Sequence, residues 1–117
     1  MGLLTTHVLD TAHGMPAAGM TIELFSIDDD KRSLVQSAVT NSSGRCDSPL
    51  LEGKDFRVGV WELVFQVAEF FTALGVELPD PPFFDRVTLR FGIADASEHY
   101  HVPLLVSPWS YSTYRGS

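Results

Sequence analysis

Short segments in which apolar and polar residues alternate, separated by residues that favour turns, recur along most of this 117-residue chain. The segment Met20–Leu24 alternates in this way, and Val87, Leu89 and Phe91 alternate with polar or charged neighbours. A period of two residues is typical of a strand that is buried on one face only. Many short strands with turns between them predict an all-β protein built as a sandwich of two sheets. The expected strands cover residues 3–9, 20–24, 34–40, 56–65, 83–91, 99–106 and 110–114.

Two segments between these strands have a distinct character. The charged residues 28–32 predict a hairpin loop. Val67, Phe70, Phe71 and Leu74 are spaced i, i+3, i+4 and i+7, which predicts one apolar face of a helix. A glycine directly afterwards is suited to close the C-terminus of that helix. We therefore expect one short helix over about residues 67–74.

Length, charge and cysteine content narrow the classes of partner. A chain of this length predicts one domain over residues 1–117. The formal net charge of -7 argues against nucleic acid or an anionic membrane surface as a partner. The single cysteine, Cys46, excludes an intrachain disulfide and suits a reducing compartment. Because no stretch is apolar enough to span a membrane and no secretory signal is recognisable, we expect a cytoplasmic protein without a membrane partner.

The histidines allow more than one interpretation. His99 and His101 are two residues apart, so they are expected on the same face of one strand. This spacing is also a zinc pattern, but no further ligand pair has a recognisable spacing, so a metal site is not favoured. The other interpretation is acid–base chemistry, because the unperturbed pKa of histidine, about 6.5, lies near neutrality. His7 lies in the first expected strand, where a single histidine is more often packed or solvated than catalytic.

Two arginines, two serines and the cysteine also have a structural and a functional interpretation. Arg45 follows a glycine in a turn and is either a solvated cation or a fixed fork that donates to a planar anionic substrate. Arg115 faces the same choice, with a developing oxyanion as the second possibility. Ser112 and Ser117 can form hydrogen bonds, but neither lies in a Gly-x-Ser-x-Gly elbow, so an acyl-enzyme serine is not expected. Cys46 beside Arg45 raises the question of a lowered thiol pKa, yet it lies in no nucleophile motif.

Several motifs, in order along the chain, resemble those of the 5-hydroxyisourate hydrolases, the transthyretin-related enzymes of urate breakdown. They are Thr6–Thr11, Gly14–Ala17, Gly44–Arg45, His99–His101 and the C-terminal Tyr114–Ser117. The resemblance covers nearly the whole chain. It implies a transthyretin-like two-sheet β-sandwich with one short helix. It also implies a homotetramer, formed as a dimer of dimers, with active sites in a channel where the final strands of opposing subunits meet.

The resemblance implies roles for individual residues. The catalytic set comprises the histidine of the first strand, the arginine after the glycine, the second histidine of His-Tyr-His and the C-terminal serine. His99 has a lesser role beside this set, and His13 matches no catalytic position and is expected in a loop. Neither a cofactor nor a metal is expected. The expected catalytic residues are His7, Arg45, His101 and Ser117, and the expected substrate-binding residues are Tyr114, Arg115, Gly116, His99 and Ser112.

The implied reaction is hydrolysis of 5-hydroxyisourate to 2-oxo-4-hydroxy-4-carboxy-5-ureidoimidazoline. Water attacks a ring carbonyl and opens the six-membered ring, which requires an activated water, a polarised carbonyl and a protonated leaving nitrogen. His7 and His101 are expected to hold and activate the water, and Arg45 to bind the anionic ring. Ser117 and Tyr114 are expected to orient the histidines or the substrate. Which histidine is the base stays open.

Two alternatives remain beside the hydrolase. One is a ligand carrier of the transthyretin type, with the same fold and channel but no chemistry. The other is a structural or adhesion sandwich. The resemblance implies that carriers lack the set formed by His7, Arg45, His101 and the Tyr-Arg-Gly-Ser end. Because this chain has the whole set, the hydrolase is favoured.

Overall fold

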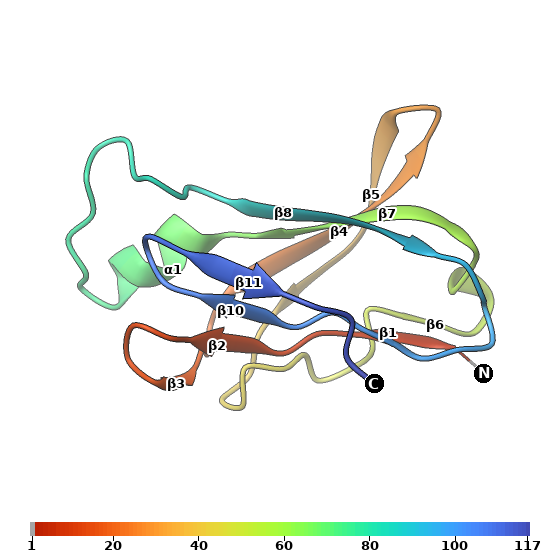
Figure 1. Cartoon of the computed structure of the whole chain (residues 1–117), viewed down its shortest axis with the longest axis horizontal. Coiled ribbons are helices and arrows are strands. Elements are labelled where there is room, and N and C mark those ends of the chain that lie inside the picture. Colours follow the sequence, from red (N-terminus) through yellow and green to blue (C-terminus); the bar gives the residue numbers. More distant parts are fainter. Residues whose placement is uncertain (1) are drawn as a thin grey trace.

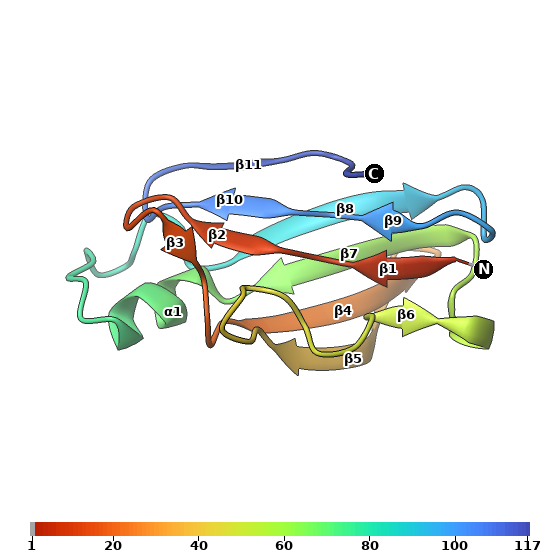
Figure 2. The same cartoon turned by 90° about the horizontal axis from the view of Figure 1, so that it is seen from below.

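Two packed layers of strands, with one short α-helix at one end, make up the protein (Figures 1 and 2). The structure is a computed structural model and describes residues 2–117. The elements are β1 (Leu3–Thr5), β2 (Val8–Asp10), β3 (Met15–Pro16), β4 (Thr21–Asp28), β5 (Lys31–Val39), β6 (Leu51–Glu52), the 3₁₀ turn η1 (Gly53–Asp55), β7 (Gly59–Phe65), α1 (Val67–Ala73), β8 (Val87–Ile93), β9 (Tyr100–His101), β10 (Leu104–Val106) and β11 (Tyr111–Thr113).

One layer is a four-stranded antiparallel sheet in the order β5-β4-β7-β8. The other contains a four-stranded sheet, β11-β10-β2-β3, and a three-stranded sheet, β6-β1-β9. Figure 2 shows these two smaller sheets end to end, with β1 in line with β2 and β9 in line with β10. The predicted two-layer sandwich with one short helix is therefore confirmed.

The alternation in the sequence corresponds to burial along β4. Ile22 and Leu24 are buried completely, whereas Thr21, Glu23 and Phe25, which alternate with them, are half-buried. The strand continues to Asp28, well beyond the predicted end at residue 24. A strand that buries one face gains stability from each apolar side chain on that face, which is why the alternation fixes the register.

The hairpin between β4 and β5 is tighter than the predicted loop over residues 28–32. Asp28 pairs with Lys31, so only Asp29 and Asp30 form the turn. Both have positive φ, at 50° and 64°. Two-residue hairpin turns of this kind require positive φ, which aspartate tolerates better than most residues.

The predicted strand over residues 83–91 begins later, at Val87, and ends at Ile93. Phe83 and Phe84 precede it and pack edge to face, with ring centroids 4.7 Å apart. Phe84 also contacts the ring of Tyr111 at 5.3 Å. These contacts, together with the prolines before them, keep this segment out of the ladder.

The first predicted strand is divided into β1 and β2, and the partner strand over residues 99–106 is divided at the same level. His7 lies in the first gap and forms an isolated antiparallel bridge with Arg45. Pro103 lies in the second gap, where it has no N–H to donate to the ladder. The divided strands run parallel to each other, β1 beside β9 and β2 beside β10.

Two backbone hydrogen bonds join the strands across the gap. The N–H of Val102 donates to the carbonyl of Thr5, and the N–H of Leu104 donates to that of His7, each at 2.9 Å. The parallel pairing is therefore continuous, and it holds the histidine of the first strand close to the His-Tyr-His segment.

The helix α1 ends as predicted, at a glycine. The N–H of Gly75 donates to the carbonyl of Thr72, and that of Val76 to Phe71, while Gly75 has a φ of 86°. This arrangement satisfies the last carbonyls of a helix and favours glycine. Leu74 was expected on the apolar face, but it is 52% exposed because it lies at the end of the helix, beyond the core.

A single cluster of buried apolar side chains joins the layers, and Trp61, Phe65 and Phe71 are its largest members. The helix contributes to this cluster from one end of the sandwich. In the part of the chain that the structure describes, no helix is long and apolar enough to cross a membrane.

Truncation of a core side chain should lower the free energy of unfolding. Leu63 in β7 is fully buried, so Leu63→Ala is expected to cost about 2–5 kcal/mol. Leu34→Ala is the matched control, because Leu34 in β5 is 58% exposed and should change stability by about 0.5 kcal/mol or less. Urea unfolding at one fixed protein concentration measures both. Equal losses in the two variants would contradict this description of the core.

Candidate active site

His7 and Arg45 are brought together by a tight turn. The turn packs on β2, where the N–H of Val8 donates to the carbonyl of Gly44 at 2.8 Å. A Cβ at Gly44 would lie 2.3 Å from the carbonyl oxygen of Val8, and the residue has a φ of 77°. Only glycine fits there, so the Gly-Arg pair of the sequence fixes where Arg45 leaves the turn.

The ring of His7 has a defined tautomer. Its Nε2 lies 2.8 Å from the backbone carbonyl of Ser43. A carbonyl oxygen only accepts hydrogen bonds, so Nε2 must carry the proton. The lone pair of the neutral ring is therefore on Nδ1.

His99 and His101 lie on the same side of their strand, as their spacing predicts. Nε2 of His99 lies 2.8 Å, and Nδ1 of His101 2.9 Å, from the hydroxyl oxygen of Thr5. Thr5 pairs with His101 in the parallel ladder between β1 and β9. No motif in the sequence points to Thr5, since only the register between these strands reveals its position.

The chain end passes over His101. The N–H of Gly116 donates to the carbonyl of His101 at 2.8 Å, and the two residues form an antiparallel bridge. A Cβ at Gly116 would lie 2.6 Å from Cδ2 of the His101 ring. Gly116 therefore contributes through its lack of a side chain, which lets the backbone lie against the ring.

A cavity of about 410 Å³ opens where these segments meet. Its walls come from β1, from the segment after the Gly-Arg turn, from the His-Tyr-His segment and from the C-terminus. The lining side chains with possible chemical roles include Thr5, Arg45, Cys46, Asp47, His99, His101 and Ser117. Three of the four expected catalytic residues thus line one cavity, and the fourth, His7, is bridged to Arg45.

The surroundings of His101 favour its neutral form. Partial burial is the largest cause that lowers its pKa from the ordinary 6.5, and the charges of Arg45, His99 and His7 lower it further. His101 is consequently unprotonated near neutral pH. Its Nδ1 faces Thr5, which leaves Nε2 as the atom for chemistry.

The pKa of the Cys46 thiol is raised, whereas the sequence suggested that it could be lowered. Burial and the neighbouring carboxylate of Asp47 raise its pKa, so no lowered thiol pKa is present. Arg45 precedes it in sequence, but desolvation favours the neutral thiol. Cys46 is therefore a wall residue of the cavity.

Tyr114, Arg115 and Ser112 do not line this cavity in the single chain. Tyr114 and Arg115 line a second cavity, of about 460 Å³, between β8 and the C-terminal segment. Ser112 is exposed in β11, where it pairs with Leu105. Of the terminal tetrapeptide, Ser117 alone contributes a lining side chain to the cavity with Arg45 and His101.

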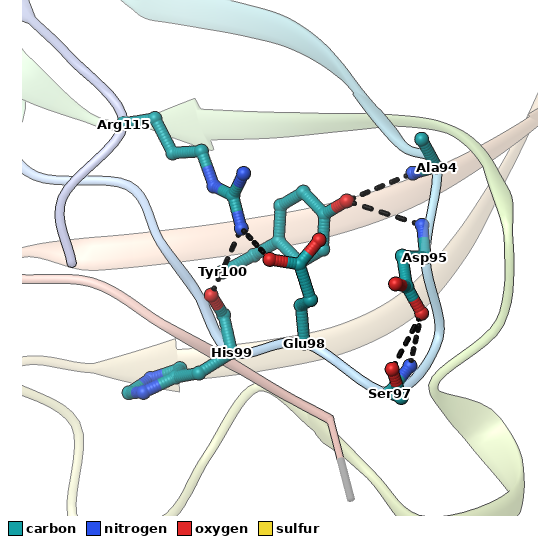
Figure 3. A network of polar contacts seen from close by, with 7 residues as sticks. All are labelled: Ala94, Asp95, Ser97, Glu98, His99, Tyr100 and Arg115. Atoms are coloured by element: carbon teal, nitrogen blue, oxygen red, sulfur yellow. Dashed lines mark hydrogen bonds and ion pairs between the residues drawn. The ribbon is translucent and has the colours of Figure 1, made fainter.

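Arg115 instead holds the segment that carries the histidines (Figure 3). Its guanidinium lies 4.1 Å from the centre of the Tyr100 ring, in a cation–π contact. Its Nη2 donates to the carbonyl of His99 at 3.3 Å and lies 3.5 Å from the carboxylate of Glu98. The hydroxyl of Tyr100 accepts from the N–H of Ala94 and of Asp95, which fixes the other end of that ring. Arg115 therefore stabilises the segment that carries the histidines, although it does not line the cavity with Arg45 and His101.

The remaining histidine lies in a turn, as expected. Nδ1 of His13 is 2.5 Å from the carboxylate of the fully buried Asp10, which also accepts from the N–H groups of Ala12 and His13.

No three His, Cys, Asp or Glu side chains among residues 2–117 are grouped so that they could hold a metal ion. A reaction without metal stays a prediction.

Addition of one methyl group at Gly116 should displace the His101 ring. The new Cβ in Gly116→Ala would be 2.6 Å from Cδ2, so the ring must move by about 1 Å to restore a normal contact. A crystal structure of the variant measures this displacement. Gly92→Ala is the control, because the nearest atom to a Cβ there is 4.0 Å away. An unmoved His101 ring in Gly116→Ala would contradict the proposed packing of the chain end.

Comparison with known proteins agrees with this fold and with these motifs. The sequence matches the HIUase/Transthyretin family over residues 4–116. It is 58% identical to the 5-hydroxyisourate hydrolase of Pseudomonas aeruginosa, over 100% of this chain and 93% of that one.

Two solved structures have a fold similar to that of this chain. (S)-allantoin synthase has a TM-score of 0.94 and 50% identity over 99% of this chain, which spans only 44% of the synthase chain. Sea bream transthyretin in complex with thyroxine has a TM-score of 0.86 and 25% identity, over 97% of this chain and 93% of that one. The chain belongs to the HIUase/Transthyretin family.

Proposed function

We propose that this protein hydrolyses 5-hydroxyisourate to 2-oxo-4-hydroxy-4-carboxy-5-ureidoimidazoline. The observation that supports this most strongly is the cavity that Arg45, His101 and Ser117 line together, although they are far apart in the sequence. The relative from Pseudomonas aeruginosa, which is named for this activity, supports the choice of substrate. Such a site offers a cation and two imidazole rings to a planar, anionic ring.

His101 is the base in this proposal. It is neutral near pH 7 because its pKa is lowered, and its Nε2 is not occupied by the bond to Thr5. It takes a proton from water while the oxygen attacks the ring carbonyl. It then returns the proton to the ring nitrogen as the carbon–nitrogen bond breaks. A base whose pKa lies near or below the working pH suits this double role.

Arg45 and His7 act on the substrate beside this base. The guanidinium of Arg45 donates to the anionic ring and to the oxygen that gains charge as water adds. His7, bridged to Arg45, presents Nδ1 as an acceptor that can orient the water. Ser117, which lines the cavity, orients the substrate through its hydroxyl.

A carrier without catalysis is the second candidate, because sea bream transthyretin, whose structure contains thyroxine, has the same fold. A carrier needs shape and apolar surface in its site, whereas general acid–base chemistry needs groups that can change charge. The cavity here contains two histidines and an arginine, which favours the hydrolase.

We propose further that the protein is a homotetramer, a dimer of dimers. Large apolar side chains are exposed around the C-terminal strand of the single chain, among them Trp109 at 60% and Tyr114 at 61%. Exposed apolar area of this kind is typical of an interface. A second subunit would also offer a route by which Tyr114 contacts substrate. The cytoplasmic location expected from the sequence stays a prediction.

The direct test follows the ultraviolet absorbance of freshly generated 5-hydroxyisourate. The protein should accelerate its decay, and His101→Ala or Arg45→Ala should lower kcat/KM by about 10²–10⁴-fold. His13→Ala is the control, because His13 lies in a turn and is not among the residues that line the cavity, so the rate should stay near wild type. A decay rate that is the same with and without protein would contradict the proposed function.

The dependence of kcat/KM on pH should report the base. His101 is active when neutral, so activity is present above its folded-state pKa and is lost as the pH falls through that value. Because this pKa is lowered from 6.5, the acid limb should lie below pH 6.5. Rates measured between about pH 5 and pH 8 test this. An acid limb above pH 6.5 would rule out His101, in these surroundings, as the base.

The assembly is tested by sedimentation equilibrium at micromolar concentration. The expected mass is four times the 12.9 kDa of one chain. Trp109→Glu should shift the distribution toward smaller species, since it introduces charge into the apolar surface. A monomer with full activity would contradict a channel shared between subunits.

A further inference from the structure

The hydroxyl of Thr5 lies between two histidine nitrogens. It is 2.8 Å from Nε2 of His99 and 2.9 Å from Nδ1 of His101. A threonine hydroxyl has one proton to donate. It can therefore donate to at most one of these nitrogens, so at least one of the two must be an N–H that donates to the threonine oxygen, which has two lone pairs. The protonation of the two rings is consequently linked through one atom.

We propose that Thr5 is a positioning residue that holds His101 in its Nδ1–H tautomer. The oxygen of Thr5 accepts the Nδ1–H of His101, and the hydroxyl proton is donated to Nε2 of His99. This order rests on the proposed function, in which the base must present a lone pair at Nε2 of His101. Both rings are then protonated on Nδ1 when neutral.

The opposite order would block the base. If the hydroxyl donated to Nδ1 of His101, the only lone pair of the neutral ring would be occupied by Thr5, and Nε2 would carry a proton. The ring could then donate to a substrate but could not take a proton from water at Nε2.

The position of Thr5 is well defined. It is half-buried in β1, opposite His101 in the ladder, and a β-branched side chain has few rotamers in a strand. The adjacent Thr6 has a separate role, because its hydroxyl donates to the carbonyl of Val102 at 2.6 Å. Thr5 is thus the hydroxyl that contacts both rings.

His7 provides an internal contrast. Its Nε2 donates to the carbonyl of Ser43, so His7 is fixed in the Nε2–H tautomer. The protein should therefore contain both tautomers at once: Nε2–H in His7, and Nδ1–H in His99 and His101. The Nε2–H form is the commoner one in free histidine, so two Nδ1–H rings are a specific outcome.

Long-range ¹H–¹⁵N NMR spectra of the histidine rings, at a pH where all are neutral, test the tautomers without an activity assay. Wild type should show Nδ1–H for His99 and His101. Thr5→Val should shift both rings toward Nε2–H while His7 is unchanged, and Thr5→Ser should retain the wild-type pattern. If His101 in wild type is protonated on Nε2, or if Thr5→Val leaves both rings unaffected, the proposal is wrong.

Steady-state kinetics with 5-hydroxyisourate provide the second arm. Thr5→Val should lower kcat by about tenfold to a hundredfold with little change in KM, less than the roughly 10²–10⁴-fold loss expected without the base. Thr5→Ser should restore most of the rate. Thr21→Val is the control, because Thr21 is a half-buried strand threonine in the opposite sheet. A Thr5→Val enzyme with wild-type kcat, or one changed in KM only, would overturn the positioning role.

The two arms separate this inference from the proposed function. If wild type does not accelerate 5-hydroxyisourate decay, the proposed function fails, yet the NMR spectra still decide the order of the hydrogen bonds. If Thr5→Val does not fold, Thr5→Ala removes the hydroxyl with a smaller side chain, and the same tautomer shift is expected. Wild-type tautomers in a folded Thr5→Ala protein would likewise overturn the proposal.

Discussion

The parallel pairing of β1 and β2 with β9 and β10 is the constraint on which the site depends. Both members are interrupted at the same level, and the backbone bonds from Val102 to Thr5 and from Leu104 to His7 cross the gap. A net contribution of about 1 kcal/mol to stability is typical of one such hydrogen bond, so two bonds alone do not stabilise this strand pairing. The buried side chains of the flanking strands, among them Leu4, Val8 and Leu104, hold it in place. The core thus positions the groups that face the cavity.

Electrostatics then determines what these groups can do. The chain as a whole has a net charge of -7, but the cavity has Arg45 and two histidines in its walls. Partial burial and, after it, repulsion from the nearby positive charges lower the pKa of His101 and keep its ring neutral. The cavity therefore places the cation of Arg45 beside an uncharged base, an arrangement suited to an anion that must react with water, and the side chain of Asp47 also lies in its wall. The same repulsion would be of no use in a site that only stores an apolar ligand.

Much of the fold follows from the sequence, because burial of one sheet face requires alternation and the helix requires a period near 3.6. Three short elements, β3, β6 and η1, were not predicted, because two or three residues cannot show a period. The strand expected from residue 83 was wrong at its start, since the aromatic side chains there pack on one another and on Tyr111.

The site could be predicted only in part, because the sequence does not give the register in which the strands pair. The motifs identified His7, Arg45, His101 and Ser117, but their roles remain proposals. Thr5 was missed, because its place opposite His101 depends on how β1 pairs with β9. Tyr114 and Arg115 line a different cavity in the single chain, which no feature of the terminal motif indicates.

Which cavity binds the planar ring is the central question, and an NMR titration with urate answers it most directly. Urate is a stable ring related to the proposed substrate, and arginine side-chain N–H signals report its contacts. We predict shifts at Arg45 and at the His101 ring, with Arg90 unaffected, because Arg90 lines only the second cavity. Shifts confined to Arg90 and Tyr114, with Arg45 and His101 unchanged, would contradict this prediction.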